Sequence, residues 1–366
     1  MNLPTRHPQV LSAVVRDHPA GGHESATHDW VAAEVARLMG LPYGGLADAA
    51  VAGFYVPDDT LTTAQARRLG VSDMHDLLGG VVPHAFVATK VVTHPLVGRQ
   101  AAAPDGWNRQ LGQSLVAATV PGYSAFAFED ACTAYARLAA GGPVRFKLPT
   151  GVGGLGQQLL ADAVQLHEAL HEIGPDYLAT HGVVLERHLE WPVTFSVGQV
   201  HCAGMCIAYY GTQTTVKDRQ GSEAYGGSDL FVVRGTLSDL LDGELAPDHR
   251  DVVAKAHVYD RFIAQAYPDF YASRRNYDVI AGSDRDGIRC SGVLEQSWRV
   301  GGATPAELAA IDAFARDPAL RSVAASTREQ YALVAPPPPA QVYYAGDDAR
   351  VGPLTKYRTV TETAHA

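Results

Sequence analysis

The chain has 366 residues, 46% of them hydrophobic, which is enough for more than one packed core. Its 36 Gly, 22 Pro and 19% charged residues are typical of a globular protein with many turns rather than a disordered one. The formal net charge of −10 excludes a general nucleic-acid binder, because neutralising phosphates requires clustered Lys and Arg.

The beginning of the chain alternates apolar runs with helical patterns. Residues 11–15 predict a strand, Gly21 and Gly22 a turn, and residues 27–39 an amphipathic helix. This order predicts an N-terminal α/β domain over residues 1–104. No signal-peptide layout is present, and no apolar stretch approaches the roughly 20 residues of a membrane span. We therefore expect a cytoplasmic protein with no membrane or nucleic-acid partner.

A polar, glycine-containing stretch at residues 101–112 marks the start of a second domain, residues 105–330. Its predicted elements are a strand at 144–147, a glycine loop at 151–156, a helix at 157–173, a strand at 183–186, paired strands over 193–213, a helix at 251–267 and a strand at 277–280.

The end of the chain begins with a stiff run of prolines at residues 336–339. We assign residues 331–366 to a Pro-rich linker and a C-terminal tail. Within the tail, residues 341–344 and 354–360 either form strands or lie on the surface.

The first pattern with chemical meaning is a strand-end lysine followed by a glycine loop: Lys147, then Gly151, Gly153, Gly154 and Gly156. Glycines let the backbone approach a phosphate group and direct N–H groups at it, and the lysine supplies positive charge. The loop lacks the G-K-[ST] ending of a Walker loop. Taken alone, it is either a cover for a triphosphate or a flexible turn.

The second pattern is a pair of acidic residues on neighbouring strands. Asp278 lies on the strand at 277–280, and Glu295 follows a turn at residues 282–287. A hairpin places the two carboxylates opposite each other, where they can share Mg²⁺ ions that bridge nucleotide phosphates. Arg299 is positioned to stabilise a transferring phosphoryl group or to bind a substrate carboxylate. The alternative is a surface hairpin with solvated acids, which the apolar neighbours of Glu295 disfavour.

In this order and spacing, the elements over residues 105–310 resemble the ATP-grasp superfamily. The resemblance implies a combined α/β and α+β fold, in which an N-terminal pre-ATP-grasp domain precedes two lobes that clamp ATP. It also implies that Lys147 and the glycine loop contact the phosphates, and that residues 183–189 are the hinge strand beside the adenine.

The resemblance assigns roles to further residues. The cofactors it implies are ATP and Mg²⁺. The hinge residues are Glu186, Arg187, His188 and Leu189, with Glu190 as the candidate for the ribose. The metal ligands are Asp278, Glu295 and Ser297. The catalytic candidates are Arg299 and Lys217, the latter from a cationic loop between the hinge and the hairpin.

The sequence departs from the family pattern in places. Ser297 stands where an Asn commonly follows the second metal acid, and Glu190 is displaced from the usual position of the ribose carboxylate. The early phosphate lysine has no obvious counterpart, and Arg109 is the nearest cation. His84 and His94, in the segment that also contains Lys90, either border a substrate site or have structural roles.

The resemblance implies a ligase that activates a carboxylate as an acyl phosphate and transfers it to an amine or a related nucleophile. The expected partners are therefore a small-molecule carboxylate and an amine, and a homodimer is a family-level expectation. Two alternatives stay open. One is carboxylation with bicarbonate, which only the shared ATP site supports; the chain as a whole resembles a bacterial branch of the superfamily described as biotin-carboxylase-like. The other is a nucleotide-binding module without chemistry.

Overall fold

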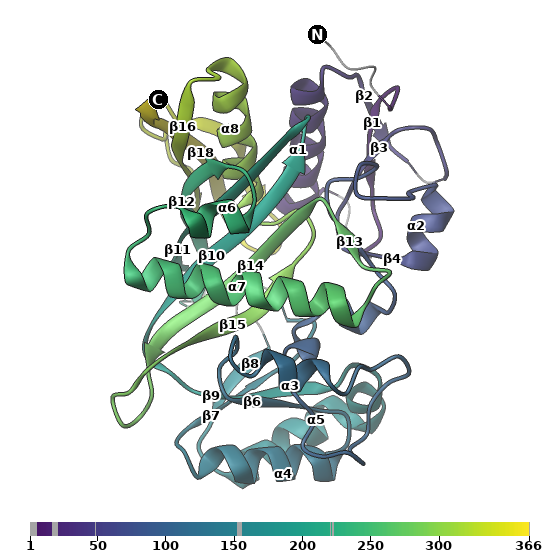
Figure 1. The fold of residues 1–366 in the computed structure, drawn as a ribbon, viewed down its shortest axis with the longest axis vertical. Helices are drawn as coiled ribbons and strands as arrows, with labels where there is room; N and C mark the ends of the chain where they lie inside the picture. Colours follow the sequence, from purple (N-terminus) through teal and green to yellow (C-terminus); the bar gives the residue numbers. More distant parts are fainter. Residues whose placement is uncertain are drawn as a thin grey trace.

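The computed structural model describes residues 6–16, 21–47, 49–151, 156–219, 221 and 223–365, with side chains up to residue 361. The strands of this part of the chain form four sheets: a parallel N-terminal sheet, a small sheet beside it, a four-stranded sheet and an eight-stranded sheet (Figure 1). The mixture of parallel and antiparallel sheets with covering helices confirms the predicted α/β and α+β class. None of the described helices is long and apolar enough to cross a membrane.

The N-terminal sheet has the strand order β2-β1-β3, and all its pairs are parallel. Its helix α1 begins at His23, earlier than the predicted residue 27, and ends at Gly40, whose φ of 66° permits the left-handed cap. The elements are β1 (Val10–Ala13), α1 (His23–Met39), β2 (Tyr43–Leu46) and β3 (Phe54–Pro57).

A small sheet joins the N-terminal domain to the rest of the chain. β5 pairs in parallel with β4 on one side and antiparallel with β13, a strand from late in the sequence, on the other. A capping box between Thr62 and Gln65 starts α2. The elements are β4 (Leu61–Thr62), α2 (Thr63–Leu69), β5 (Gly80–Val82) and β13 (Tyr271–Ala272).

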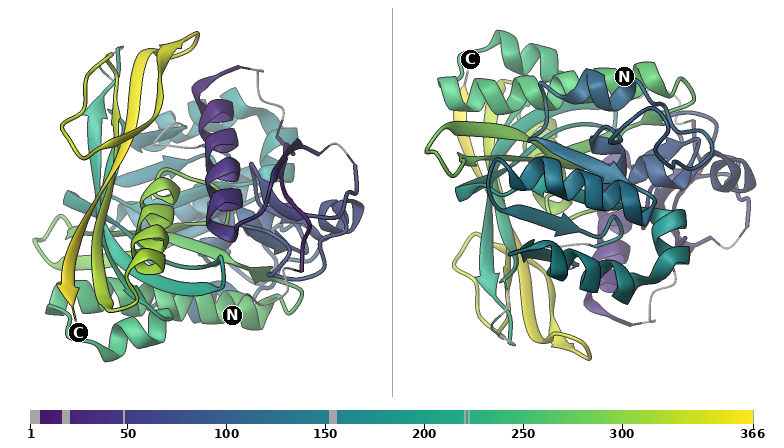
Figure 2. Two further views of the ribbon diagram at one scale, coloured as in Figure 1. Left: turned by 90° about the horizontal axis from the view of Figure 1, so that it is seen from above. Right: turned by 90° about the horizontal axis from the view of Figure 1, so that it is seen from below.

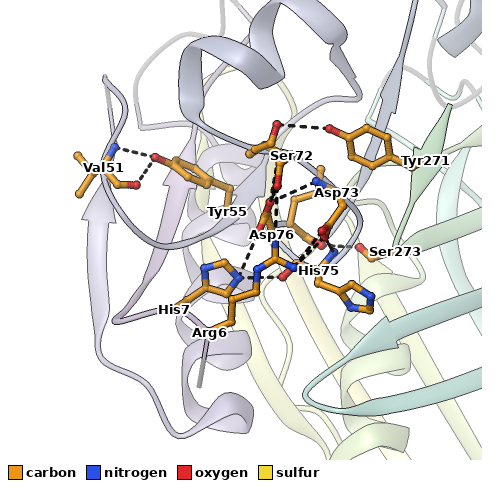
Figure 3. Close-up of polar contacts among 12 residues, drawn as sticks. Arg6, His7, Val51, Tyr55, Ser72, Asp73, His75, Asp76, Tyr271 and Ser273 are labelled. Atoms are coloured by element: carbon orange, nitrogen blue, oxygen red, sulfur yellow. Dashed lines mark hydrogen bonds and ion pairs between the residues drawn. The ribbon is translucent and has the colours of Figure 1, made fainter. Parts of the chain in front are cut away.

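Polar contacts strengthen this junction (Figure 3). Ser273 Oγ donates to the carbonyl of Leu77 at 2.5 Å and accepts from the amide of Gly79 at 3.1 Å. In the same loop, the Asp76 carboxylate lies 3.1 Å from a guanidinium nitrogen of Arg6. The loop before β5 is thus held from both sides, by the N-terminus and by the residues that follow β13.

The four-stranded sheet, in the order β6-β9-β7-β8, forms a separate lobe covered by α4 and α5 (Figure 1). The residues after the glycine loop form β8 rather than the predicted start of a helix, because Gln157 pairs with Lys147 of β7. The helix begins only after Asp162, which caps its N-terminus. The elements are α3 (Leu111–Leu115), β6 (Gly122–Ala125), α4 (Phe128–Ala139), β7 (Val144–Lys147), β8 (Gln157–Leu160), α5 (Ala163–His181) and β9 (Val183–Arg187).

The eight-stranded sheet has the order β15-β14-β10-β11-β12-β16-β18-β17. One face packs against α6 and α7, and the other packs against α8 and the N-terminal α1, which lie side by side in Figure 2. The elements are β10 (Glu190–Cys202), β11 (Met205–Lys217), β12 (Glu223–Arg234), α6 (Leu237–Asp242), α7 (Pro247–Ala266), β14 (Arg274–Ser283), β15 (Arg289–Ser297), α8 (Thr304–Arg316), β16 (Leu320–Gln330), β17 (Gln341–Asp348) and β18 (Gly352–His365).

The C-terminal segment belongs to this sheet, whereas the sequence suggests a linker and tail. β18 pairs antiparallel with β16 from Leu320 to Gln330, and β17 pairs with β18. Buried Arg358 contacts the carboxylate of Glu34 on α1. Of the two alternatives for residues 341–344 and 354–360, the structure contains the strands, because the open edge of β16 supplies unpaired backbone groups.

Candidate nucleotide and metal site

A buried cluster of three charged or titratable side chains lies beneath the start of the glycine loop. Lys147, at the end of β7, forms an ion pair with Glu186 of the neighbouring strand β9. The second oxygen of Glu186 lies 2.8 Å from His94 Nε2. All three residues are at most 3% exposed. The resemblance assigned both Lys147 and Glu186 to the nucleotide site. The structure adds that their side chains contact each other directly.

The electrostatics of this cluster keep Glu186 ionised. Burial by itself would raise the pKa of Glu186, but the Lys147 ammonium and the hydrogen bond with His94 outweigh it and lower the pKa to about 2. The His94 ring packs on Gly122, where a Cβ would lie 2.7 Å from it. Its Nδ1 is buried without a hydrogen-bond partner among the described residues.

The described ends of the glycine loop are closed by backbone contacts. The amide of Leu148 donates to the carbonyl of Gly156 at 2.8 Å, and Gly156 has a φ of 70°. Lys90 Nζ donates to the carbonyl of Gly151 at 2.9 Å. Gly153 and Gly154 lie outside the described residues, so their predicted phosphate contacts stay predictions.

The acidic hairpin has the geometry expected from the sequence. β14 and β15 are antiparallel, and Asp278 lies directly opposite Glu295. Glu295 Oε2 is 2.9 Å from Lys90 Nζ, so one buried lysine contacts both this hairpin and the glycine loop. Asp278 accepts hydrogen bonds from Gln213 Nε2 at 2.6 Å and from Asn276 Nδ2 at 3.2 Å.

Burial and the nearby Glu295 carboxylate raise the pKa of Asp278 to about 7, against the opposing effects of Gln213 and Asn276. Lys90 compensates only part of the charge of these two close carboxylates. A divalent cation would supply the rest, and carboxylate oxygens are the ligands Mg²⁺ prefers. These residues therefore fit Mg²⁺.

The protein alone does not complete a metal coordination sphere. No group of three or more His, Cys, Asp or Glu residues within the described part of the chain is arranged to hold a metal ion. Ser297 lies opposite Asn276 in the hairpin, and its carbonyl accepts from Arg274 at 3.2 Å. A cation on Asp278 and Glu295 would thus need oxygens from a bound ligand, as phosphates would provide.

Arg299 follows this hairpin and faces the N-terminal domain. Its Nε lies 3.6 Å from Asp59 Oδ1. Its backbone carbonyl accepts from Arg274, whose guanidinium also forms a buried, two-point ion pair with Glu307 at 2.7 Å. This buried pair fixes the path of the chain between the metal hairpin and α8.

The predicted hinge connects the two lobes. β9 ends at Arg187 and β10 begins at Glu190. The amides of Arg187 and His188 already donate to the carbonyls of Pro121 and Pro143, at 2.8 and 2.9 Å. Leu189 is buried and Glu190 is exposed. The structure shows that this segment links β9 to β10, whereas its role as a hinge and the adenine and ribose contacts stay predictions.

Lys217 lies far from the Asp278–Glu295 pair in this structure. It is exposed, opposite Glu223 near the end of β11. Ser196 of β10 pairs with both Asp278 and Gly211, so Lys217 is six residues beyond the row of Asp278, or about 20 Å along the strand. The residue of β11 that contacts Asp278 is Gln213.

The sequence-based assignment missed three residues of the site: Lys90, Gln213 and Asn276. Lys90 contacts both Glu295 and Gly151, whereas exposed Arg109, the nearest cation considered from the sequence, donates to the carbonyl of Ala101. Lys90 belongs to η2 (Lys90–Thr93), a single turn outside the second domain predicted from the sequence. The one sequence feature that could have indicated Lys90 is its position as a lysine within an apolar segment.

Two open hollows of the described surface lie elsewhere. One, of about 450 Å³, is lined by Arg219 and the turn between β17 and β18. The other, of about 550 Å³, lies over β11, β12, β16 and β18 on the large sheet. The candidate site therefore rests on its side-chain contacts and not on a pre-formed cavity.

A family model described as "Protein of unknown function (DUF3182)" matches residues 10–358. The chain belongs to this family. No curated protein matches the sequence of this DUF3182 chain.

Solved structures resemble this DUF3182 chain over nearly its whole length. N5-carboxyaminoimidazole synthetase from Staphylococcus aureus, complexed with ADP, is 12% identical with a TM-score of 0.57, covering 99% of this chain and 96% of that one. Phosphoribosylamine–glycine ligase from Thermotoga maritima, also 12% identical, has a TM-score of 0.48 and covers 96% of this chain and 93% of its own. The likeness to the first of these structures shows that the chain shares its fold. This confirms the predicted ATP-grasp fold class, with an N-terminal α/β domain before the ATP-grasp lobes.

Proposed function

We propose that this protein is an ATP- and Mg²⁺-dependent ligase that activates a carboxylate as an acyl phosphate and transfers the acyl group to an amine or a related nucleophile. The observation that carries the proposal is the partly buried Asp278 opposite Glu295, with Lys90 joining that pair to the glycine loop. A structural hairpin has no need of two close carboxylates beside a buried lysine.

Each side chain has a separate task in this proposal. Asp278 and Glu295 hold Mg²⁺, which supplies charge neutralisation for the phosphates. Lys147 and Lys90 provide fixed positive charge on the phosphate side, and Glu186 keeps Lys147 in place. Arg299 orients the acid. The glycine loop excludes water from a product that would otherwise hydrolyse.

Nucleotide binding is the first test. A ligand that binds only the folded state stabilises it by about 2.7 kcal/mol at a concentration 100 times its dissociation constant, so ATP with Mg²⁺ should raise the melting temperature. The absence of any shift at millimolar nucleotide, with protein shown to be folded, would contradict the proposal.

Turnover then distinguishes the alternatives. ADP and phosphate release should be screened against candidate carboxylates, starting with amino acids and short peptides, with and without an added amine. Release that requires an acid and an amine supports the ligase, and release that requires only bicarbonate supports the carboxylase alternative. ATP binding without turnover in the whole series supports a binding module.

A further inference from the structure

The carboxyl ends of two adjacent parallel strands bring charged residues together in the N-terminal domain. Arg16 follows β1, and Asp58 and Asp59 follow β3 directly, and the two strands pair in register. Ligands of open α/β sheets bind outside the carboxyl ends of the strands. Asp58 Oδ1 accepts from the amide of Val15 at 2.7 Å, which holds the two strand ends side by side.

Arg299 approaches the same edge from the other domain. Asp59 contacts the Nε of Arg16 with one oxygen, and its other oxygen lies 3.6 Å from the Nε of Arg299. Arg299 is four residues beyond Glu295. The strand ends of the N-terminal sheet therefore lie next to the metal hairpin, with a pair of arginines at the junction.

The junction contains two guanidinium groups and two carboxylates, but the carboxylate of Asp58 accepts from the backbone amides of Val15 and Arg16. The two guanidinium groups share the Asp59 carboxylate, and Arg299 also donates to the carbonyl of Val300 at 3.0 Å. Each guanidinium carries five N–H donors, so these contacts do not use its full capacity. Burial and the neighbouring Arg16 lower the pKa of Arg299, against the opposing effects of Asp59 and Glu295. The two guanidinium groups therefore have N–H donors left for an anion, and Asp59 is the internal competitor for them.

We infer that Arg16 and Arg299 together bind a second anionic group of the acid substrate, which is therefore a small dianion carrying a carboxylate or a phosphate besides the carboxylate that reacts. The inference rests on the proposed function for the identity of the reacting group. A guanidinium fork matches the geometry of either anion. A group bound there lies on the N-terminal side of Arg299, apart from the acid that reacts at the metal hairpin.

The test is direct binding of matched probes by calorimetry, without nucleotide and again with Mg²⁺ and a non-hydrolysable ATP analogue. Succinate against butyrate tests a second carboxylate, and 3-phosphoglycerate against glycerate tests a phosphate. We expect at least one dianion to bind about tenfold or more tightly than its monoanion, and Arg16→Gln to remove this preference. Equal affinity within both pairs, including no binding by any probe, would overturn the inference.

Three further variants distinguish the loss of an anion-binding group from disruption of the fold. Arg16→Lys keeps the charge and should retain part of the preference. Asp59→Asn removes the internal competitor and should tighten dianion binding several-fold, which disruption of the fold would not do. Arg68→Gln, on the exposed face of α2, should leave both affinities unchanged. If Arg16→Gln or Asp59→Asn shows the same dianion preference as the unmodified protein, the inference is also overturned.

The two proposals fail separately. Loss of Mg²⁺-ATP binding would contradict the proposed function but leave the nucleotide-free discrimination between anions measurable. Conversely, the protein could bind Mg²⁺-ATP, turn over a monocarboxylate and show equal affinity for the two members of each matched pair. That outcome would support the ligase proposal and contradict the dianion inference.

Discussion

The environment of Asp278 makes its contribution to stability depend on pH. Its pKa of about 7 in the folded chain lies well above the ordinary value of 3.8. Between these two values the folded Asp278 holds a proton that the unfolded chain has released. The contribution of Asp278 to stability therefore falls as pH rises through this window, in the absence of metal.

The variant Asp278→Asn tests this sign. Since Asn resembles the protonated acid, we expect the variant to be stabilised relative to the unmodified protein in a chelator, and by about 3 kcal/mol more at pH 8 than at pH 5. Urea unfolding at the two pH values measures it. Asp286→Asn, at an exposed site in the hairpin turn, serves as the control and should show no such difference.

Glu295 should matter for phosphoryl transfer more than for adenine binding. Glu295→Gln keeps the shape of the side chain but removes the charge that would hold the ion. We expect substrate-dependent ADP release to fall by two orders of magnitude or more, which corresponds to about 3 kcal/mol, while metal-free nucleotide binding changes little. Near-normal ADP release across a Mg²⁺ titration would return the hairpin to a structural role.

At the scale of elements, the segment containing η1 (Ala85–Ala88) and η2 joins the two lobes. Gln296 of β15 donates to the carbonyls of Val87 and Thr89 at 2.8 and 2.9 Å, and accepts from Tyr259 of α7 at 2.9 Å. On the other side, Ser124 of β6 donates to the carbonyl of Val91 at 2.5 Å. These hydrogen bonds hold the segment that places Lys90 and His94 at the candidate site.

Replacing Gln296 with Leu should loosen the joint. The change removes the donor to two carbonyls and one of the two partners of the Tyr259 hydroxyl, which also contacts Thr93, at a cost on the order of 3 kcal/mol in total. We expect a lower urea midpoint and weaker nucleotide binding than in the unmodified protein, because Lys90 is no longer held in position. Gln158→Leu, at an exposed position of β8, is the matched control. An unchanged midpoint would show that the joint does not depend on Gln296.

At the scale of the whole molecule, the C-terminal strands are part of the core rather than an appendage. β18 covers the edge of β16, and its buried Lys356 pairs with Glu329 at 3.0 Å. α1 and α8 share one hydrophobic core with β10, β11, β12 and β16, so the N-terminal helix and the ATP-grasp sheet are one packed unit.

Truncation after Gln330 should therefore abolish folding instead of releasing an intact ATP-grasp domain. It exposes an edge strand, leaves the buried Glu329 without its cationic partner at a cost of about 3 kcal/mol or more, and removes one of the two arginines that pair with Glu34. Together these losses are large beside the stability of a typical domain. Size-exclusion chromatography and circular dichroism measure the outcome. A chain ending at Glu362, which keeps most pairs between β16 and β18, should remain folded, and a monomeric, helical product from the shorter chain would contradict this reasoning.

The sequence by itself determined the parts of the site that depend on local order. Asp278 and Glu295 could be paired because a short hairpin places alternating residues of its two strands opposite each other. Lys147 could be placed at a glycine loop because the two are adjacent in the chain. Hydrophobic periodicity predicted an N-terminal α/β domain, and the resemblance in the order of the elements implied the ATP-grasp fold.

Only the tertiary structure decided which distant residues complete the site. Lys90, His94 and Gln213 reach it through long-range packing, and their neighbours in the sequence carry no repeating pattern that reveals this contact. Lys217 shows the converse. It matched the expected order in the sequence, but it lies six residues along β11 from the row of Asp278. The strand β8 and the C-terminal strands were likewise decided by available partner edges, because a strand is stabilised by hydrogen bonds to another segment whereas a helix satisfies its own.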